Sequence, residues 1–170
     1  MHAMESINRK AWTSALAGYA KAAGIMDQGE ARAFALVLAA CPRPAILDLG
    51  VGGGRTAGLL APRAGRYVGI DYLPDMVERA RRNHPRLDFR QADARDLSVF
   101  ASGSFDVVVF SCNGIDSVDP KGRAAVMREV GRVLRPGGVF VFSSFHREWS
   151  GFRDRRSLRR LIFTPDPIRL

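Results

Sequence analysis

The sequence predicts an α/β protein built on a doubly wound parallel sheet. Short, continuously apolar runs recur along the chain and alternate with longer segments of helical periodicity. The first apolar run leads directly into a turn that holds four glycines in five positions, residues 50–54, and an acidic residue stands at the end of each of the first three runs. Continuous apolar strands alternating with helices are typical of a parallel sheet covered on both faces and joined by right-handed crossovers.

Five strands are expected, at residues 45–49, 67–71, 87–93, 105–111 and 139–144. Their expected order in the sheet is 3-2-1-4-5, as in other doubly wound domains, which bind ligands beyond the carboxyl ends of the strands. We therefore expect one rim of the sheet to gather the residues that follow each strand: Asp48, Asp71, Asp93, Ser111–Asp116 and Ser143–His146.

Helical patterns occupy residues 5–24, 27–41, 55–60, 74–83 and 121–134. In the second helix, Asp27 is the expected N-cap and Glu30 stands three residues further on, as in a capping box. Pro74 suits the first position of the fourth helix. Trp12 and Tyr19 share one face of the first helix and are interpreted either as packing or as a lid over the ligand.

At 170 residues the chain has the length of one domain. We expect a helical cap over residues 1–44, a ligand-binding core over 45–145, and a basic helix or tail over 146–170. No signal peptide is recognisable and no apolar run is long enough to span a membrane, so a cytoplasmic protein without membrane association is expected. Cys41 and Cys112 fall at opposite ends of the sheet and should be free thiols.

The net charge of +9 comes mainly from arginine, because only three of the 26 basic residues are lysines. We interpret this excess as a solvated basic surface. A phosphate-bearing partner is the less favoured alternative, since the arginine-rich segment 146–170 lacks the alternating aromatic residues of a groove for single-stranded nucleic acid.

The glycine turn predicts a nucleoside ligand without a pyrophosphate. Gly50 and Gly52 match the dinucleotide fingerprint G-x-G-x-x-G, but Arg55 stands at its third glycine position. The spacing that fits is D-x-G-x-G-x-G, from Asp48 to Gly54. A carboxylate at Asp48 repels a pyrophosphate and favours a ligand that carries an ammonium group and a sulfonium. These residues argue against a nicotinamide-dependent oxidoreductase.

Two further acids support a nucleoside. Asp71 is placed to accept hydrogen bonds from ribose hydroxyls, and Asp93 to accept one from an adenine amino group. Loop capping explains any one of these aspartates. Three acids at three successive strand ends, next to the glycine turn, favour a binding site.

These segments resemble the class I S-adenosylmethionine-dependent methyltransferases, which have a Rossmann-like fold. "LDLGVGGGRT" is similar to their first motif, "GIDYLPDMVERAR" to the ribose-binding segment, "FRQADARDL" to the adenine-binding segment and "LRPGGVFVFSS" to the segment of the fifth strand. The resemblance covers about residues 45–145. "FSCNGIDSVDPKGR" is similar to a bacterial subset with Asn-Gly-Ile-Asp after the fourth strand.

The resemblance implies S-adenosylmethionine as cofactor. It places Asp48 and the glycines at the methionine end and Asp71 at the ribose hydroxyls. Tyr72 and Met76 lie beside the adenosine, and Asp93 meets the adenine amino group. The residues expected to contact the cofactor are Asp48, Gly50, Gly52, Gly54, Asp71, Tyr72, Met76, Asp93, Ala94 and Ser111.

The sequence departs from this family after the fifth strand. Class I enzymes usually continue with a helix and an antiparallel strand pair, whereas only 25 residues follow Phe145 here. We expect one helix over about residues 154–163, no strand pair, and therefore an uncovered edge at the fifth strand. An uncovered edge predicts a homodimer formed through that strand or the tail. A cofactor-binding protein or subunit without activity of its own is the alternative to an enzyme.

The residues expected to act on the methyl acceptor are Asn113, Asp116 and His146. Methyl transfer mainly requires that the nucleophile be held against the methyl carbon, and a general base helps where the nucleophile is protonated. Asn113 either orients the acceptor or forms a turn with Gly114, and His146 is either a base or a surface residue. The chain lacks the Asn/Asp-Pro-Pro-aromatic motif and the Pro-Cys pair of nucleic-acid methylases, which favours a small-molecule acceptor.

Overall fold

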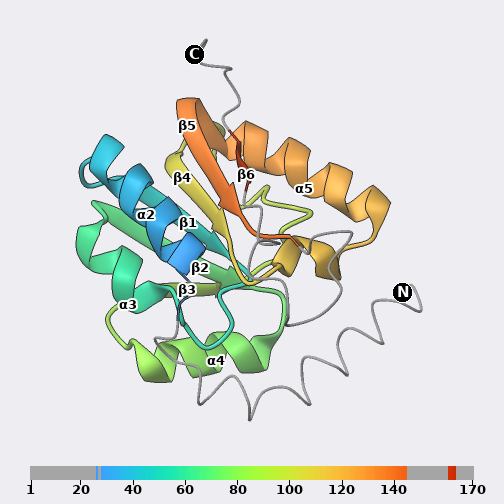
Figure 1. Ribbon diagram of the computed structural model, residues 1–170. Coiled ribbons are helices and arrows are strands. Elements are labelled where there is room, and N and C mark those ends of the chain that lie inside the picture. The colour runs from blue at the N-terminus through green and yellow to red at the C-terminus, as the bar shows by residue number, and fades with distance from the viewer. Residues whose placement is uncertain (1–25, 27, 145–160, 164–170) are drawn as a thin grey trace, which may run out of the picture.

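Figure 1 shows the computed structural model, which describes residue 26, residues 28–144 and residues 161–163. The helix expected at residues 5–24, with Trp12 and Tyr19, lies outside the described residues. The same holds for Asp27, the expected N-cap, and for His146.

A six-stranded sheet in the order β3-β2-β1-β4-β5-β6 forms the centre of the molecule. The first five strands run parallel and have the predicted order 3-2-1-4-5. β6 runs antiparallel to β5. The strands are β1 (Ala45–Leu49), β2 (Arg66–Asp71), β3 (Asp88–Gln91), β4 (Phe105–Phe110), β5 (Leu134–Phe142) and β6 (Leu161–Phe163).

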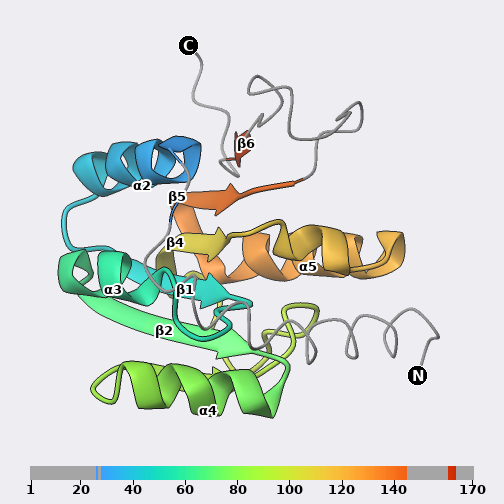
Figure 2. The same cartoon turned by 60° about the horizontal axis from the view of Figure 1, so that its bottom comes forward.

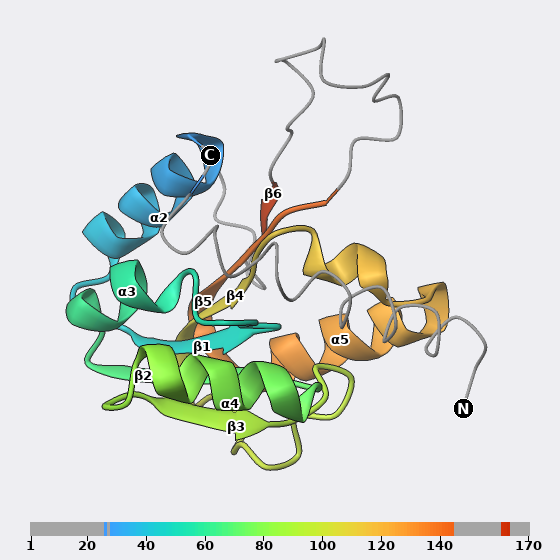
Figure 3. The same ribbon diagram turned by 90° about the horizontal axis from the view of Figure 1, so that it is seen from below.

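Helices cover both faces of this sheet, as Figures 2 and 3 show. On one face lie α2 (Gln28–Ala40), α3 (Ala57–Leu60) with its short extension η1 (Ala61–Arg63), and α4 (Pro74–Asn83). On the other face lies α5 (Pro120–Val133). The side chains of the buried strands alternate between the two core clusters, so that Ile46 packs toward α2 and α3 while Leu47 packs toward α5. The prediction of a doubly wound domain is confirmed.

The C-terminal end of the sheet differs from the prediction. A helix was expected over about residues 154–163, but residues 161–163 form β6 and pair with Phe140–Phe142 of β5. β5 is therefore not a free edge along that stretch. The predicted helix is wrong at residues 161–163, and so is the prediction of an uncovered edge at residues 140–142. Three residues suffice, because β5 offers a row of unpaired backbone groups to any extended segment that reaches it.

The bounds of the other elements are close to the expected ones. β1 and α4 match the prediction, α3 begins two residues later, at Ala57, and β5 begins five residues earlier, at Leu134. Within β5 the pairing with β4 shifts register between Phe105 and Val107. Among the described helices, none combines the length and the apolar character that a membrane crossing requires. Cys41 and Cys112 are free thiols, as expected.

Candidate cofactor site

A cavity opens at the carboxyl ends of β1, β2 and β4, on the rim where the sequence predicts ligand binding. Its walls are the glycine turn after β1, the segments that follow β2, β3 and β4, and the turn before α5. The predicted cofactor residues that line it are Gly50, Gly52, Asp71, Tyr72, Met76, Asp93, Ala94 and Ser111.

The glycine turn brings bare backbone to this cavity. Gly50 and Gly52 have φ of +60° and +55°, a left-handed conformation that glycine adopts without steric cost. A Cβ on Gly50 would lie 2.9 Å from the ring of Phe110, whereas a Cβ on Gly52 would meet nothing within 4 Å. Gly52 therefore leaves open space that a ligand can approach closely.

The turn is held in place from α4 as well as from β2. The side-chain amide of Asn83 donates to the carbonyl oxygen of Gly53 (2.8 Å), and Nε2 of His84 lies 3.0 Å from the carbonyl oxygen of Gly54. Gly54 packs against His84 and is absent from the cavity lining. A side chain at Gly54 would collide with His84, so this glycine lets the turn pack against the end of α4.

Asp71 lies at the end of β2 with only 7% of its surface exposed. Its Oδ2 accepts a hydrogen bond from the backbone N–H of Gly52 (2.9 Å), and its Oδ1 accepts one from the N–H of Leu73 (2.9 Å). Burial raises the pKa of this carboxyl, and the backbone donors counteract the rise. Each carboxylate oxygen can accept a second hydrogen bond, so the side chain can hold the turn and also receive ribose hydroxyls.

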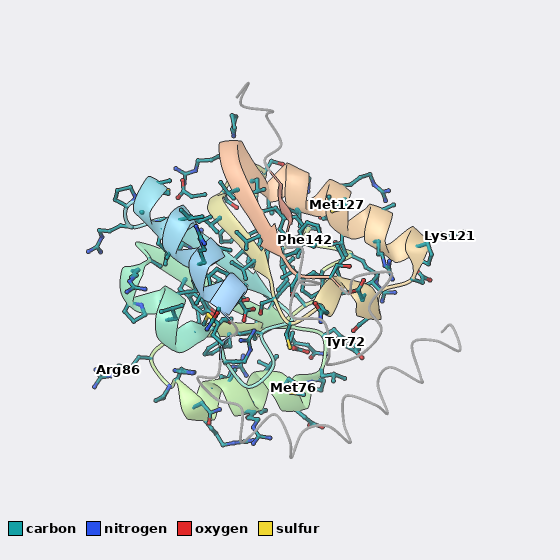
Figure 4. The ribbon with its side chains drawn as sticks, viewed as in Figure 1. Tyr72, Met76, Arg86, Lys121, Met127 and Phe142 are labelled. Carbon is teal, nitrogen blue, oxygen red and sulfur yellow. The ribbon has the colours of Figure 1, made fainter. Side chains whose placement is uncertain are left out.

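Tyr72 and Met76 lie near the carboxyl ends of the strands, whereas Arg86 projects from the opposite side of the molecule (Figure 4). Met76 is 4% exposed, so it forms an apolar part of the wall. Asp93 accepts hydrogen bonds from the backbone N–H and the guanidinium of Arg95, at 2.5–3.0 Å. Asp93 can meet an adenine amino group only by sharing its oxygens with Arg95.

Arg55 replaces the third glycine of the dinucleotide fingerprint. Its side chain connects the glycine turn to α2 and to the segment after β4. Its guanidinium donates two hydrogen bonds of 2.7 Å to the carboxylate of Glu30 on α2 and one of 3.1 Å to the hydroxyl of Ser111 after β4. The side chain of Glu30 is 6% exposed and that of Arg55 is 15% exposed. This pair was not among the residues predicted from the sequence. A signal for it exists, because Glu30 shares one helical face with the buried residues Ala33, Phe34 and Val37.

Asp48 occupies a different place from the predicted one. It is fully buried on the face of β1 that α2 and α3 cover, and it does not line the cavity. Its Oδ2 accepts hydrogen bonds from the hydroxyls of Thr56 and, at 2.8 Å, of Tyr67. Thr56 does line the cavity. The hydroxyl of Thr56 therefore lies between the carboxyl group of Asp48 and the cavity.

The predicted catalytic residues after β4 adjoin the cavity without lining it. Asn113 has φ of +56° and precedes the short helix η2 (Gly114–Ser117), and its backbone N–H donates to the hydroxyl of Ser143 (2.7 Å). Its side-chain oxygen is buried and has no hydrogen-bond partner within the described residues. Asp116 accepts a hydrogen bond from Ser144 (3.0 Å). Their neighbours Cys112, Gly114 and Ser117 line the cavity.

Comparison with known proteins decides the family. A family model described as "methyltransferase domain" matches residues 46–138, more than half of the 170 residues. The chain belongs to this family. Similar proteins are named as methyltransferases, and several of these names state that the enzyme depends on S-adenosylmethionine.

Individual relatives of this methyltransferase domain are moderately similar. An uncharacterised methyltransferase of Synechocystis is 36% identical over 110 residues, which are 65% of this chain and 51% of the relative. The demethylmenaquinone methyltransferase of Beutenbergia cavernae is 38% identical over 128 residues, which are 75% of this chain and 52% of the relative. A SAM-bound amino pentose methyltransferase of Micromonospora echinaspora has 28% identity and a TM-score of 0.63, covering 76% of this chain and 55% of that one. The chain spans about half the length of these relatives.

The residues present fit S-adenosylmethionine, the cofactor of this family. The turn after β1 leaves open space at Gly52, where backbone can lie against a nucleoside. A buried carboxylate with free acceptor capacity stands at the end of β2, where ribose hydroxyls need it. Apolar Met76 and the backbone around Ala94 complete the wall for a flat aromatic base.

Proposed function

We propose that this protein transfers a methyl group from S-adenosylmethionine to a small-molecule acceptor. The observation that carries the proposal is the cavity itself: Asp71 and the open backbone at Gly52 meet at the carboxyl end of the sheet, in a chain of the methyltransferase family. Binding without turnover is the alternative raised by the sequence, and no feature of the described residues favours it.

The side chains around the cavity bind and orient rather than react. When bound, the cofactor supplies a methyl group activated by its sulfonium sulfur. Asp71 accepts from the ribose hydroxyls while it holds the glycine turn, and Met76 shields one side of the base from water. Arg55 keeps α2 and the end of β4 at a fixed separation. Fixing the donor in this way supplies much of the rate of an in-line displacement.

The acceptor is proposed to lie against the segment after β4. Asn113 would orient it after its side-chain oxygen, which is buried and has no partner among the described residues, turns toward the cavity lined by the adjacent Cys112 and Gly114. Asp116 or His146 would take a proton where the nucleophile carries one. The relatives support a small molecule as acceptor, since one is named for demethylmenaquinone and another for an amino pentose. These two acceptors differ so much that the similarity does not select one.

Calorimetry tests the cofactor, and labelling tests the reaction. S-adenosylmethionine and S-adenosylhomocysteine should bind, and NAD should not; tight NAD binding without a response to S-adenosylhomocysteine would overturn the proposal. Incubation with methyl-labelled cofactor and a cell extract should then transfer label to a small molecule. Label confined to RNA or DNA would contradict the proposed acceptor class.

We also propose that the protein is a cytoplasmic homodimer. Its two free thiols suit a reducing compartment. β6 pairs with residues 140–142 of β5 only, so among the described residues the earlier part of β5 has no strand on that side. An unpaired edge of this kind favours association between copies. Light scattering on dilute protein tests the dimer, and a monomer would refute it.

A further inference from the structure

The two oxygens of the Asp48 carboxyl group differ in their hydrogen bonding. The side chain is fully enclosed, and both neighbouring hydroxyls, those of Thr56 and Tyr67, donate to the same oxygen, Oδ2. The other oxygen, Oδ1, is buried and has no hydrogen-bond partner among the residues that the structure describes. An ionised carboxylate needs partners on both oxygens, so an unpartnered oxygen in the interior disfavours the charged form.

The charged and titratable groups that face Asp48 do not compensate its charge. Arg55, from the segment after the glycine turn, favours the ionised form, but two hydrogen bonds of 2.7 Å join its guanidinium to the carboxylate of Glu30 on α2. On β2, burial and the neighbouring Asp48 raise the pKa of Tyr67, so its hydroxyl stays protonated. On β4 the residue in register is the apolar Val109.

Thr56 links this carboxyl group to the cavity, because it lines the cavity and donates to Asp48. A cation bound in the cavity next to Thr56 is therefore one side chain away from Asp48. In a poorly solvated interior, a positive charge at that separation favours the ionised carboxylate strongly.

We propose that Asp48 couples ligand binding to the release of a proton: the sulfonium charge of the cofactor draws the buried carboxyl group further into its ionised form than the product does, because the product has the same ammonium group but an uncharged sulfur. The proton passes from the carboxyl group to the solvent. The inference rests on the proposed function. It makes the preference of the protein for cofactor over product depend on pH.

The size of the effect follows from the acidity of the free protein. Burial raises the pKa of Asp48 to about 6, although the hydroxyls of Thr56 and Tyr67 and the charge of Arg55 counteract the rise. At pH 5 roughly one molecule in eleven is then ionised, and a ligand that binds only this form loses about tenfold in affinity. At pH 8 the loss vanishes. The ratio of the dissociation constants of product and cofactor should therefore fall by up to about tenfold from pH 8 to pH 5.

Calorimetry in buffers of different ionisation enthalpy counts the protons released on binding. At pH 6, S-adenosylmethionine should release up to about half a proton more than S-adenosylhomocysteine, because about half of the Asp48 carboxyls carry a proton there. Asp71, whose pKa burial also raises, would contact the ribose of both ligands, so its contribution cancels in the difference. Equal proton release by the two ligands would overturn the proposal.

Three variants assign the proton. Asp48→Asn keeps the shape and one acceptor oxygen, and should abolish the difference while both ligands still bind. Tyr67→Phe removes a donor to the carboxylate and should move the release toward higher pH, which keeps the proposal testable if the first variant does not fold. Asp106→Asn is the control, since Asp106 binds Ala45 and Arg135 at the opposite end of the sheet. A difference that survives Asp48→Asn would refute the assignment. If neither ligand binds the wild type, the proposed function itself fails.

Discussion

Replacing Asp71 with alanine tests whether one carboxylate both binds the ribose and holds the glycine turn. The carboxylate accepts hydrogen bonds of 2.9 Å from the backbone N–H groups of Gly52 and Leu73, and the residue is 7% exposed. Alanine leaves both donors without an acceptor. It also removes the acceptor that the ribose hydroxyls need.

The magnitudes follow from these contacts. A hydrogen bond to a charged group contributes about 1.5–3 kcal/mol to stability, and water that enters from the cavity recovers part of each loss. We expect the free energy of unfolding to fall by about 2–4 kcal/mol in total. Because a domain is stable by about 5–15 kcal/mol, the variant should still fold. Its affinity for S-adenosylhomocysteine should fall at least about tenfold, the equivalent of 1.4 kcal/mol.

Urea denaturation measures the first quantity and titration calorimetry the second. The matched control is Asp88→Ala on the neighbouring strand β3, where an exposed carboxylate pairs with Arg90. That change should cost less than about 1 kcal/mol and leave the affinity unchanged. If Asp71→Ala matches the wild type in stability to within about 0.5 kcal/mol and binds the ligand as tightly, the ribose lies elsewhere and the turn does not depend on this residue.

Three further changes test other parts of the structure. Glu30→Gln removes the negative charge that pairs with Arg55 and should lower the free energy of unfolding in urea by about 1.5–3 kcal/mol, the contribution of a hydrogen bond to a charged group; an unchanged value would mean that the pair is solvated. Gly114→Ala puts a methyl group 2.2 Å from a ring carbon of Phe110 and should cost about 1–3 kcal/mol, whereas Gly131→Ala, in open space on α5, should stabilise the fold by about 0.5–1 kcal/mol. The pKa of Asp48 is raised to about 6 in the folded state, so the folded state binds the Asp48 proton more tightly than the unfolded chain does. This proton stabilises the fold at low pH, and the stabilisation is lost as the pH rises through 6. The free energy of unfolding of Asp48→Asn, relative to that of the wild type, should therefore rise by about 2–3 kcal/mol between pH 4 and pH 7.5. A difference that does not change with pH in urea denaturation would contradict the raised pKa.

The parts of the fold that local pattern determines were predictable. β1 and β4 are mainly apolar runs between turn residues, and each contains one aspartate. α4 starts at a proline and has a narrow apolar stripe. The start of β5 was not predictable, because Pro136 and the glycines after it indicate a turn, whereas pairing with β4 extends the strand back to Leu134. β6 is three residues long, and its only cause is the distant strand that it joins.

The sequence predicted which strand ends form the candidate site, but it did not predict all the contacts that the side chains make there. The parallel topology brings Asp71 and the glycine turn together whatever the side chains do. The position of Asp48 at a strand end does not give the direction of its side chain. The alternation along β1 does, because it places Asp48 with Ile46 on the face that α2 and α3 cover. The partner of Arg55 lies 25 residues earlier on another element, and no local rule connects residues at that separation.

The two thiols of the chain lie at opposite ends of the sheet, and this separation has a practical use. Cys112 is exposed on the wall of the cavity, whereas Cys41 is half-buried before β1. A molecule that fills the cavity shields the first sulfur from alkylating reagents and leaves the second as accessible as before. The ratio of the two alkylation rates therefore measures how much of the cavity is occupied, with Cys41 as the internal reference. Ligands can be screened in this way without a tag, a fluorophore or a known acceptor.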